Sequence, residues 1–162
     1  MPDNYIVDPI IPNTLVASLK EAFSVQASTV IEITGAKAIL AAAVSGISVA
    51  AVLGIRSSEL AGTLALCFQK ATFLGIVNRM LGEKYVEIDA DNSDAAGELL
   101  NILYASARVK INEAGNNFLP SLPTVVRGDK IEISHGTVPK IVKIDCHCEF
   151  GDFHLEVSLK KI

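Results

Sequence analysis

The sequence has no excess of positive charge: 14 Lys and Arg stand against 18 Asp and Glu, a formal net charge of −4 over 162 residues. Without a cluster of Lys or Arg, we expect neither nucleic acid nor an anionic membrane surface as a partner. The chain starts without a basic segment followed by an apolar one, so no secretory signal is expected. The three cysteines, an odd number, form no disulfide framework. These features favour a cytoplasmic location with reduced thiols.

Two kinds of binding motif are also missing. Neither G-x-G-x-x-G nor the P-loop spacing occurs, so the glycines form no phosphate-binding loop. Cys146-His147-Cys148 resembles part of a zinc site, but alternation along a strand sends both cysteines to one face and the histidine to the other. A fourth ligand, His135 or His154, lacks finger-like spacing. We expect no metal site in this chain.

Hydrophobic residues, by contrast, make up 50% of the chain, and its length suits one domain with its own core. The uncharged run 38–55 has 18 residues, the minimum for a membrane span. It is rich in Ala, Gly and Ser, includes the turn signal Ser45-Gly46, and has no aromatic belt or basic flank. We therefore predict that this run forms short strands of a well-covered sheet. A membrane span remains the alternative.

Periodicity predicts the other elements. Apolar residues recur at helical spacing in three segments and alternate in the strand-like ones, as in 62–68, where Cys67 is interpreted as a small buried hydrophobe. The helices are expected at 12–24, 69–81 and 93–115, and the strands at 29–34, 47–55, 62–68, 142–148 and 153–159, the last two joined at Gly151-Asp152. We predict one α+β domain, residues 1–162, with helices packed on a largely antiparallel sheet.

The predicted helix 93–115 has two distinct faces. Ser93 is a suitable N-cap, and Asp94 lies in the first turn, where a carboxylate interacts well with the helix dipole. One stripe of the helical wheel is apolar and predicted to be buried: Ala96, Leu100, Leu103, Ala107, Ile111 and Ala114. The opposite stripe carries Asp94, Glu98, Asn101, Ala105, Arg108 and Asn112, bordered by Ile102 and Val109. Because Glu98 and Asn101 are three residues apart, their side chains lie side by side on a surface shaped for a partner.

The sequence around this pair resembles the CheX/CheC family of chemotaxis phosphatases. The family pattern has Asp or Ser four residues before Glu, Asn three after it, and Pro about twenty residues on, which here are Asp94, Glu98, Asn101 and Pro123. The segments LGIRSSELAGTLALCFQKATFLGIVNRMLGE and LPTVVRGDKIEIS are also similar to the family. The helix at 12–24 has no second E-x-x-N, so the chain resembles CheX most. The resemblance implies a CheC-like fold.

The resemblance also implies a function: hydrolysis of the aspartyl phosphate of a phosphorylated CheY-type response regulator. Asn101 then holds the attacking water, and Glu98 pairs with a lysine of the regulator. Asp94 is expected to help orient the site. The residues expected to support the pair or contact the partner are Ile102, Ala105, Arg108 and Pro123. The chain is expected to need no cofactor of its own, because the regulator carries the Mg²⁺.

Two further expectations follow. The alternative function is a non-catalytic module that binds a response regulator or resembles a flagellar switch domain. The family relation also implies a homodimer that joins two sheets. An uncharged strand rich in Ala, Ser and Gly, lacking the Lys or Pro that protects an open edge, supports such pairing.

Overall fold

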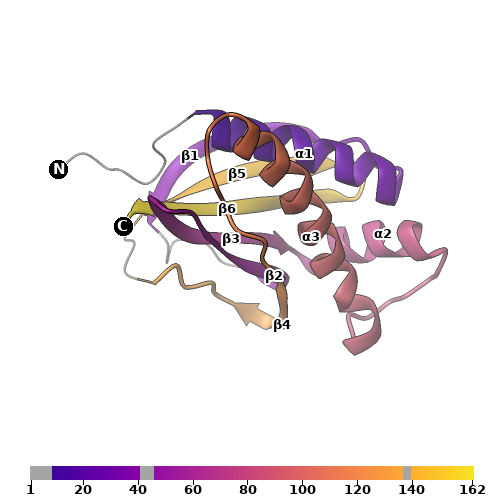
Figure 1. Cartoon of the computed structure of the whole chain (residues 1–162). Coiled ribbons are helices and arrows are strands. Elements are labelled where there is room, and N and C mark those ends of the chain that lie inside the picture. The colour runs from indigo at the N-terminus through magenta and orange to yellow at the C-terminus, as the bar shows by residue number, and fades with distance from the viewer. Residues whose placement is uncertain (1–8, 41–45, 137–139) are drawn as a thin grey trace.

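The structure, a computed structural model, describes residues 9–40, 46–136 and 140–162. This part of the chain forms three helices and six strands, arranged in a helical layer against a sheet (Figure 1). The helices are α1 (Ile10–Ala27), α2 (Lys70–Leu81) and α3 (Ala90–Glu113). The strands are β1 (Glu32–Leu40), β2 (Ile47–Arg56), β3 (Leu60–Phe68), β4 (Thr124–Ile131), β5 (Lys140–Cys148) and β6 (Gly151–Lys161).

The six strands form one sheet in the order β1-β5-β6-β3-β2-β4, and every neighbouring pair is antiparallel. The α+β class and the antiparallel sheet are therefore confirmed. Strands β2 and β3 make a long hairpin, and β6 brings the end of the chain to the centre of the sheet beside β3. The edges of the sheet are β1 and β4.

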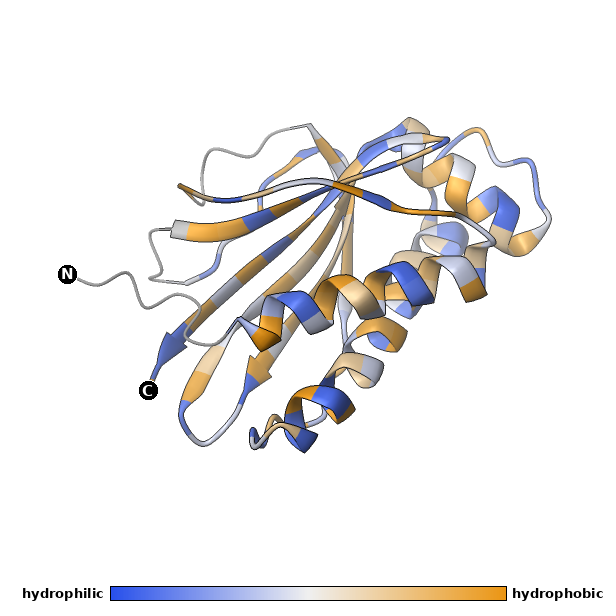
Figure 2. Cartoon of the chain, turned by 90° about the horizontal axis from the view of Figure 1, so that it is seen from above, coloured by the Kyte–Doolittle hydropathy of each residue, from blue (hydrophilic) through white to orange (hydrophobic). Residues whose placement is uncertain are grey.

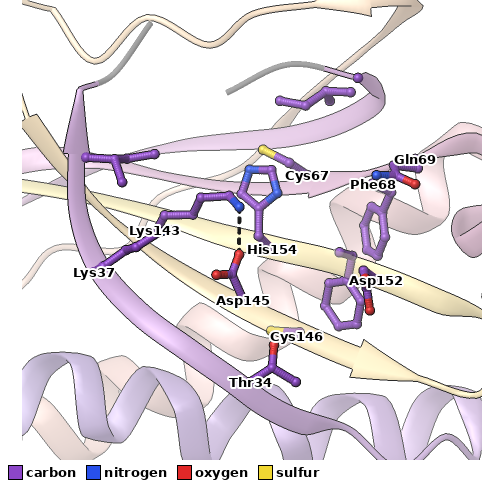
Figure 3. Close-up of a pocket in the computed structure, with 14 residues that line it drawn as sticks. Thr34, Lys37, Cys67, Phe68, Gln69, Lys143, Asp145, Cys146, Asp152 and His154 are labelled. Atoms are coloured by element: carbon purple, nitrogen blue, oxygen red, sulfur yellow. Dashed lines mark hydrogen bonds and ion pairs between the residues drawn. The ribbon is translucent and has the colours of Figure 1, made fainter. Parts of the chain in front are cut away.

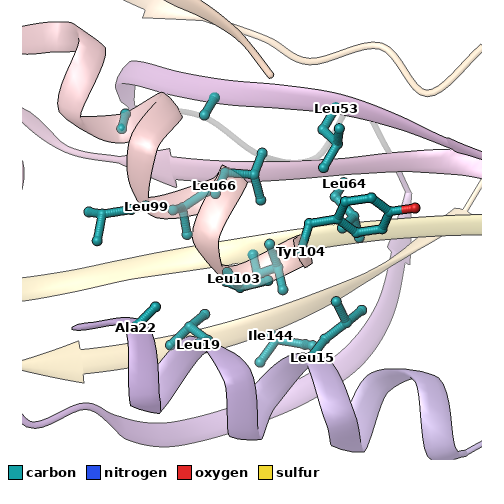
Figure 4. Close-up of a cluster of buried hydrophobic side chains, with 14 of the residues drawn as sticks. Leu15, Leu19, Ala22, Leu53, Leu64, Leu66, Leu99, Leu103, Tyr104 and Ile144 are labelled. Carbon is teal, nitrogen blue, oxygen red and sulfur yellow. The ribbon is translucent and has the colours of Figure 1, made fainter. Parts of the chain in front are cut away.

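Both α1 and α3 cover the same face of the sheet, and α2 lies beyond the strand ends (Figure 1). The core between these layers takes leucines from α1 and α3 and apolar side chains from alternate positions of the strands (Figure 4). At its α2 end the core contains a group of rings, in which Phe153 stacks on Phe23 at 4.9 Å and on Phe68 at 5.1 Å between centroids. The alternation of hydrophobic and hydrophilic residues along these elements is visible in Figure 2.

The segments predicted from periodicity form the expected helices and strands, but their first and last residues differ from the predicted ones. Strands β2 and β3 and helix α2 begin and end within two residues of the predicted ranges, and Gly82 terminates α2 in the left-handed conformation, with φ 66°. Other boundaries differ by more. Helix α1 ends at Ala27 and not near Ser24, α3 begins at Ala90 and not at Ser93, and β1 covers 32–40 and not 29–34. The last hairpin turns at Glu149-Phe150, because Cys148 pairs with Gly151.

The uncharged run 38–55 divides between two strands of different exposure. Its second part is β2, whose inward residues are buried beneath α3. Its first part ends β1 at the sheet edge, where Leu40 is 60% exposed, so the prediction of a well-covered strand was wrong there. Ser45 of the predicted turn lies outside the described residues. Among the described helices, none is long and apolar enough to cross a membrane.

Candidate functional site

Helix α3 begins at Ala90, and its N-cap lies four residues before Ser93, the predicted N-cap. The N-cap is Asp89, whose carboxylate accepts a hydrogen bond from the backbone N–H of Asn92 at 2.8 Å. The Asn92 side chain accepts in return from the Asp89 N–H at 2.9 Å, which completes a capping box. Ser93 is buried within the helix, so its prediction as N-cap was wrong, and Asp94 lies in the second turn. Asp91 is the acidic residue in the first turn, where its carboxylate interacts favourably with the helix dipole.

The two predicted faces of α3 are present. Five of the six residues expected in the buried stripe are buried, and only Ala114, which ends the helix, is exposed. On the opposite side four predicted residues are exposed: Asp94, Glu98, Asn101 and Ala105. We call these four the outer stripe of α3. Ile102 and Arg108 are half-buried at its margin. Amphipathic periodicity thus located the surface correctly.

Close packing against the edge of the sheet holds the outer stripe in place. Gly97, directly before Glu98, lies over β4, and a Cβ built on it meets the Val125 side chain at 3.0 Å. A larger residue at this position requires either Val125 or α3 to move. The spacing of α3 from β4 therefore depends on a residue next to the candidate pair.

The loop that follows α3 is tied back to the helix. Asn112 accepts a hydrogen bond from the Phe118 N–H at 2.8 Å and donates to the Phe118 carbonyl at 3.0 Å. The Tyr104 hydroxyl donates to the Leu119 carbonyl at 2.6 Å. Burial raises the pKa of Tyr104, partly offset by the charge of Arg108, so the phenol remains a donor. Asn112, expected on a free surface, instead anchors this loop.

Pro123 lies at the end of the anchored loop. It is half-buried and directly precedes β4, the strand on which Gly97 of α3 packs. Six of the predicted site residues lie on the single helix α3: Asp94, Glu98, Asn101, Ile102, Ala105 and Arg108. Pro123 lies directly before the neighbouring strand β4.

The candidate pair has no partner within the described part of the chain. Neither the Glu98 carboxylate nor the Asn101 carboxamide makes a side-chain hydrogen bond or ion pair there, and both are exposed. A carboxylate offers only acceptors, and a carboxamide offers one acceptor and two donors. These groups can therefore bind a cation and orient a water or phosphoryl oxygen supplied by another molecule.

The other face of the sheet carries polar groups that the sequence analysis did not bring together. Cys67 and His154 line a cleft of about 590 Å³ there, beside Lys143 and Asp145 (Figure 3). Cys67 is buried as predicted, but it lies against the Glu156 carboxylate at 3.4 Å. The side chain packs with the small apolar group of Ile47, Ala50 and Ala65 and also meets this one carboxylate. The orientation predicted for the C-terminal cysteines was right: Cys146 and Cys148 are buried in the core, and His147 is exposed.

Comparison with known proteins agrees with this geometry. The family described as chemotaxis phosphatase CheX matches residues 49–147. The CheY-P phosphatase CheX of Thermotoga maritima is 32% identical over 115 residues, which cover 70% of this chain and 72% of that protein. The residues matched by the family model, 49–147, include α3 and β4.

Two solved structures share the fold. A CheC-like superfamily protein from Shewanella sp. PV-4 has a TM-score of 0.84 at 22% identity and covers 94% of this chain and 99% of its own. The CheX–CheY–BeF3–Mg²⁺ complex from Borrelia burgdorferi includes a chain with a TM-score of 0.68 at 12% identity, covering 92% of this chain and 97% of that one. The fold is therefore CheC-like, and the chain belongs to the CheX family of chemotaxis phosphatases, a family of hydrolases.

Proposed function

We propose that this phosphatase hydrolyses the aspartyl phosphate of a CheY-type response regulator, with the outer stripe of α3 as the face that meets it. The observation that carries the proposal is the exposed Glu98 and Asn101 on one turn of α3, without side-chain partners among the described residues, in a chain of the CheX family. The relative from Thermotoga maritima is a CheY-P phosphatase, and the Borrelia burgdorferi protein forms a complex with CheY and Mg²⁺. Both support this choice of substrate.

Asn101 is proposed to position the attacking water. An acyl phosphate is already reactive, so its hydrolysis depends on in-line attack more than on a strong base. A carboxamide can accept a hydrogen bond from the water while it donates to a phosphoryl oxygen. Its exposure on α3 allows it to reach into the regulator. The regulator supplies the Mg²⁺ that neutralises the developing charge, so no cofactor of this chain takes part.

Glu98 is proposed to dock the regulator. An ionised carboxylate with free acceptors pairs well with a lysine ammonium, and such a pair fixes the register of the two proteins. Asp94, one turn earlier on the same exposed side, adds negative charge that favours the same encounter. At the rim, Ile102, Ala105, Arg108 and Pro123 are proposed to support the contact. A phosphorylated regulator as substrate also implies a cytoplasmic location.

The direct test is phosphate release from a phosphorylated regulator, with and without this protein. An active phosphatase accelerates release well above the regulator's own rate of autodephosphorylation. A non-catalytic adaptor, in contrast, binds the regulator and leaves that rate unchanged. Binding is measured in parallel, so an unsuitable regulator, which neither binds nor responds, is distinguished from an adaptor.

We also propose that residues 1–162 form one domain and that two copies form a symmetric dimer through a sheet edge. The sheet joins β1 to β6 across the chain, which supports a single domain. Among the described residues of the uncharged run, 38–40 lie at the end of the edge strand β1, whereas 47–55 lie in β2, inside the sheet. The run therefore supports pairing through a sheet edge less than the sequence suggested. Light scattering should give a mass near twice the 17.2 kDa of one chain, and a mass of 17.2 kDa that does not change on concentration contradicts the dimer.

A further inference from the structure

The face of the sheet opposite α1 and α3 carries a compact group of metal-binding side chains. Along β3 and β6, alternate residues point into the core beneath the helices, so the residues between them point the other way. Cys67 of β3 and His154 of β6 are directly paired across the strands, and Glu156 follows two residues later on the same face. Three donor types, a thiol, an imidazole and a carboxylate, therefore lie next to one another.

The distances within this group are short. Cys67 Sγ lies 3.4 Å from Glu156 Oε2, and His154 Nε2 lies 2.9 Å from the same oxygen. One ligand atom from each residue lies within 4.8 Å of the other two. Cys67 and Glu156 are buried, and the His154 side chain is 11% exposed.

His135 covers the group from a separate segment. It follows β4 along the chain, its side chain is fully buried, and its Nε2 lies 2.8 Å from Glu156 Oε1. Its other ring nitrogen, Nδ1, lies 3.2 Å from the Ser158 hydroxyl, which also accepts from the Thr63 N–H at 3.1 Å. The Ser158 hydroxyl thus orients the His135 ring toward Glu156, and such outer hydrogen bonds are typical of metal-binding carboxylates. We call Cys67, His135, His154 and Glu156 the far-face cluster.

The charge of the far-face cluster suits a cation. The Glu156 carboxylate lies at the middle of the cluster, with His135 Nε2 at 2.8 Å from one oxygen, and His154 Nε2 at 2.9 Å and Cys67 Sγ at 3.4 Å from the other. Two lysines line the cleft: Lys143 is paired with Asp145 at 2.6 Å, and Lys37 is exposed on the neighbouring strand β1 (Figure 3). A dication that enters the cleft can therefore reach the Glu156 carboxylate past one paired ammonium and one that extends into solvent.

We propose that the far-face cluster binds one zinc ion through Cys67, His154 and Glu156, with a solvent molecule from the cleft as the fourth ligand and His135 holding the second oxygen of Glu156. In tetrahedral zinc sites with sulfur, nitrogen and oxygen ligands, neighbouring donor atoms are about 3.4–3.6 Å apart. The three protein donors here lie within 4.8 Å of one another, close to that spacing. A mixed set of thiolate, imidazole and carboxylate favours zinc over Mg²⁺ or Ca²⁺, which take oxygen ligands.

Binding is balanced in protons and charge. The Cys67 thiol loses its proton to solvent, and neutral His154 keeps one proton on the ring nitrogen that does not bind zinc. His135 stays outside the ligand set, with its Nε2 at Glu156 and its Nδ1 at the Ser158 hydroxyl. One thiolate and one carboxylate neutralise the dication. The cleft lined by Cys67 and His154 gives the ion a path from solvent.

The proposed site is structural and does not take part in hydrolysis. It lies across the sheet from α3, and it fixes His135, and with it the segment after β4, to the centre of the sheet. This inference departs from the expectation of no metal, which considered Cys146 and Cys148 as ligands. Those cysteines are buried in the core on the helix side.

Cobalt titration tests the site directly. Co²⁺ added to the metal-free protein should bind in one equivalent, with the visible bands of a tetrahedral ion and a near-ultraviolet thiolate-to-cobalt band. Cys67→Ala should lose the thiolate band. Cys146→Ala is the matched control, because that cysteine is equally buried but faces the core, and it should keep the band. A wild-type protein without these bands, or a Cys67→Ala variant that retains the thiolate band, overturns the proposal.

Zinc affinity gives a second measurement that does not depend on the thiol band. Competition with a chromogenic chelator should show that His154→Ala weakens zinc binding by at least about 100-fold. His147→Ala, which removes an exposed histidine on the same sheet face, should leave the affinity unchanged. Circular dichroism of each variant separates ligand loss from unfolding. Equal affinity in a folded His154→Ala variant contradicts the assignment of this ligand.

Discussion

The outer stripe of α3 and the far-face cluster hold polar side chains in opposite ways. Glu98 and Asn101 are exposed and lack side-chain partners in the described residues, whereas Glu156 is buried and lies within hydrogen-bond distance of two histidines. A buried charge must be satisfied within the fold, since its desolvation is costly. An exposed carboxamide carries no such cost and stays available. The first arrangement suits an intermolecular reaction, and the second suits stability or a bound ion.

The consequence is a separation of the two functions. Substitutions on the outer stripe of α3 should change activity with little effect on folding. Substitutions in the far-face cluster should change stability with little effect on the intrinsic rate of the folded protein. Variants from each region, measured for both properties, can break this separation.

The largest expected effect is on catalysis. Asn101→Ala should lower the maximal rate of dephosphorylation by about ten- to a thousandfold, because it removes the group that aligns the water. The thermal midpoint should hardly change, since Ala is favourable at an exposed helix position. Single-turnover phosphate release at saturating enzyme measures the rate. Glu113→Ala, an exposed substitution at the far end of α3 and outside the outer stripe, is the control and should stay near wild type. An equally active Asn101 variant rejects the water-positioning role.

The next effect concerns stability. Glu156→Gln should lower the free energy of unfolding of the metal-free protein by about 2 kcal/mol, because it replaces a buried charged acceptor of two histidines. Asp152→Asn is the control: Asp152 pairs with His147 at 2.6 Å, but both are exposed, and its loss should have little effect. Urea unfolding with a chelator present compares the two. If both variants lose the same free energy of unfolding, the buried Glu156 contributes no more stability than the exposed pair of Asp152 and His147.

A smaller effect is expected on docking. Glu98→Ala should weaken the complex with a phosphorylated regulator by about tenfold while the rate at saturation is largely kept. The affinity of wild type should fall as salt rises, and that of Glu98→Ala should fall less, because one charge pair is missing. Glu113→Ala, an exposed carboxylate at the far end of α3, serves as the control. A large loss of the saturated rate in the Glu98 variant assigns this residue to the chemistry and not to docking.

These two regions also differ in how well the sequence predicts them. The outer stripe of α3 follows from local spacing, since residues three or four apart share a face of any α-helix. Glu98 and Asn101 could therefore be placed before the structure was known. The same rule gave the buried stripe, and period-two alternation gave the orientation of Cys146 and Cys148.

The far-face cluster depends on register, which local spacing does not encode. Cys67 and Glu156 are 89 residues apart and meet only because β6 pairs with β3 in one particular register. His135 joins them from a segment outside any regular element. The one local signal was β6 itself, where His154, Glu156 and Ser158 alternate with core residues in a strand buried on both faces. Polar residues at such positions need partners.

The start of α3 was misplaced for a different reason: its cap is local, since Asp89 and Asn92 are three residues apart, but Ser93 is also a residue type that suits an N-cap. This cap provides the smallest predicted effect. Asp89→Ala should lower stability by about 1 kcal/mol, because the Asn92 N–H loses its acceptor. Ser93→Ala should cost less, since Ser93 does not cap the helix. Both variants keep the outer stripe of α3, so the rate of phosphate release from the folded protein should match wild type. Urea unfolding and phosphate release on the same preparations check this. A larger loss of stability for Ser93→Ala than for Asp89→Ala would identify Ser93 as the N-cap, as the sequence predicted.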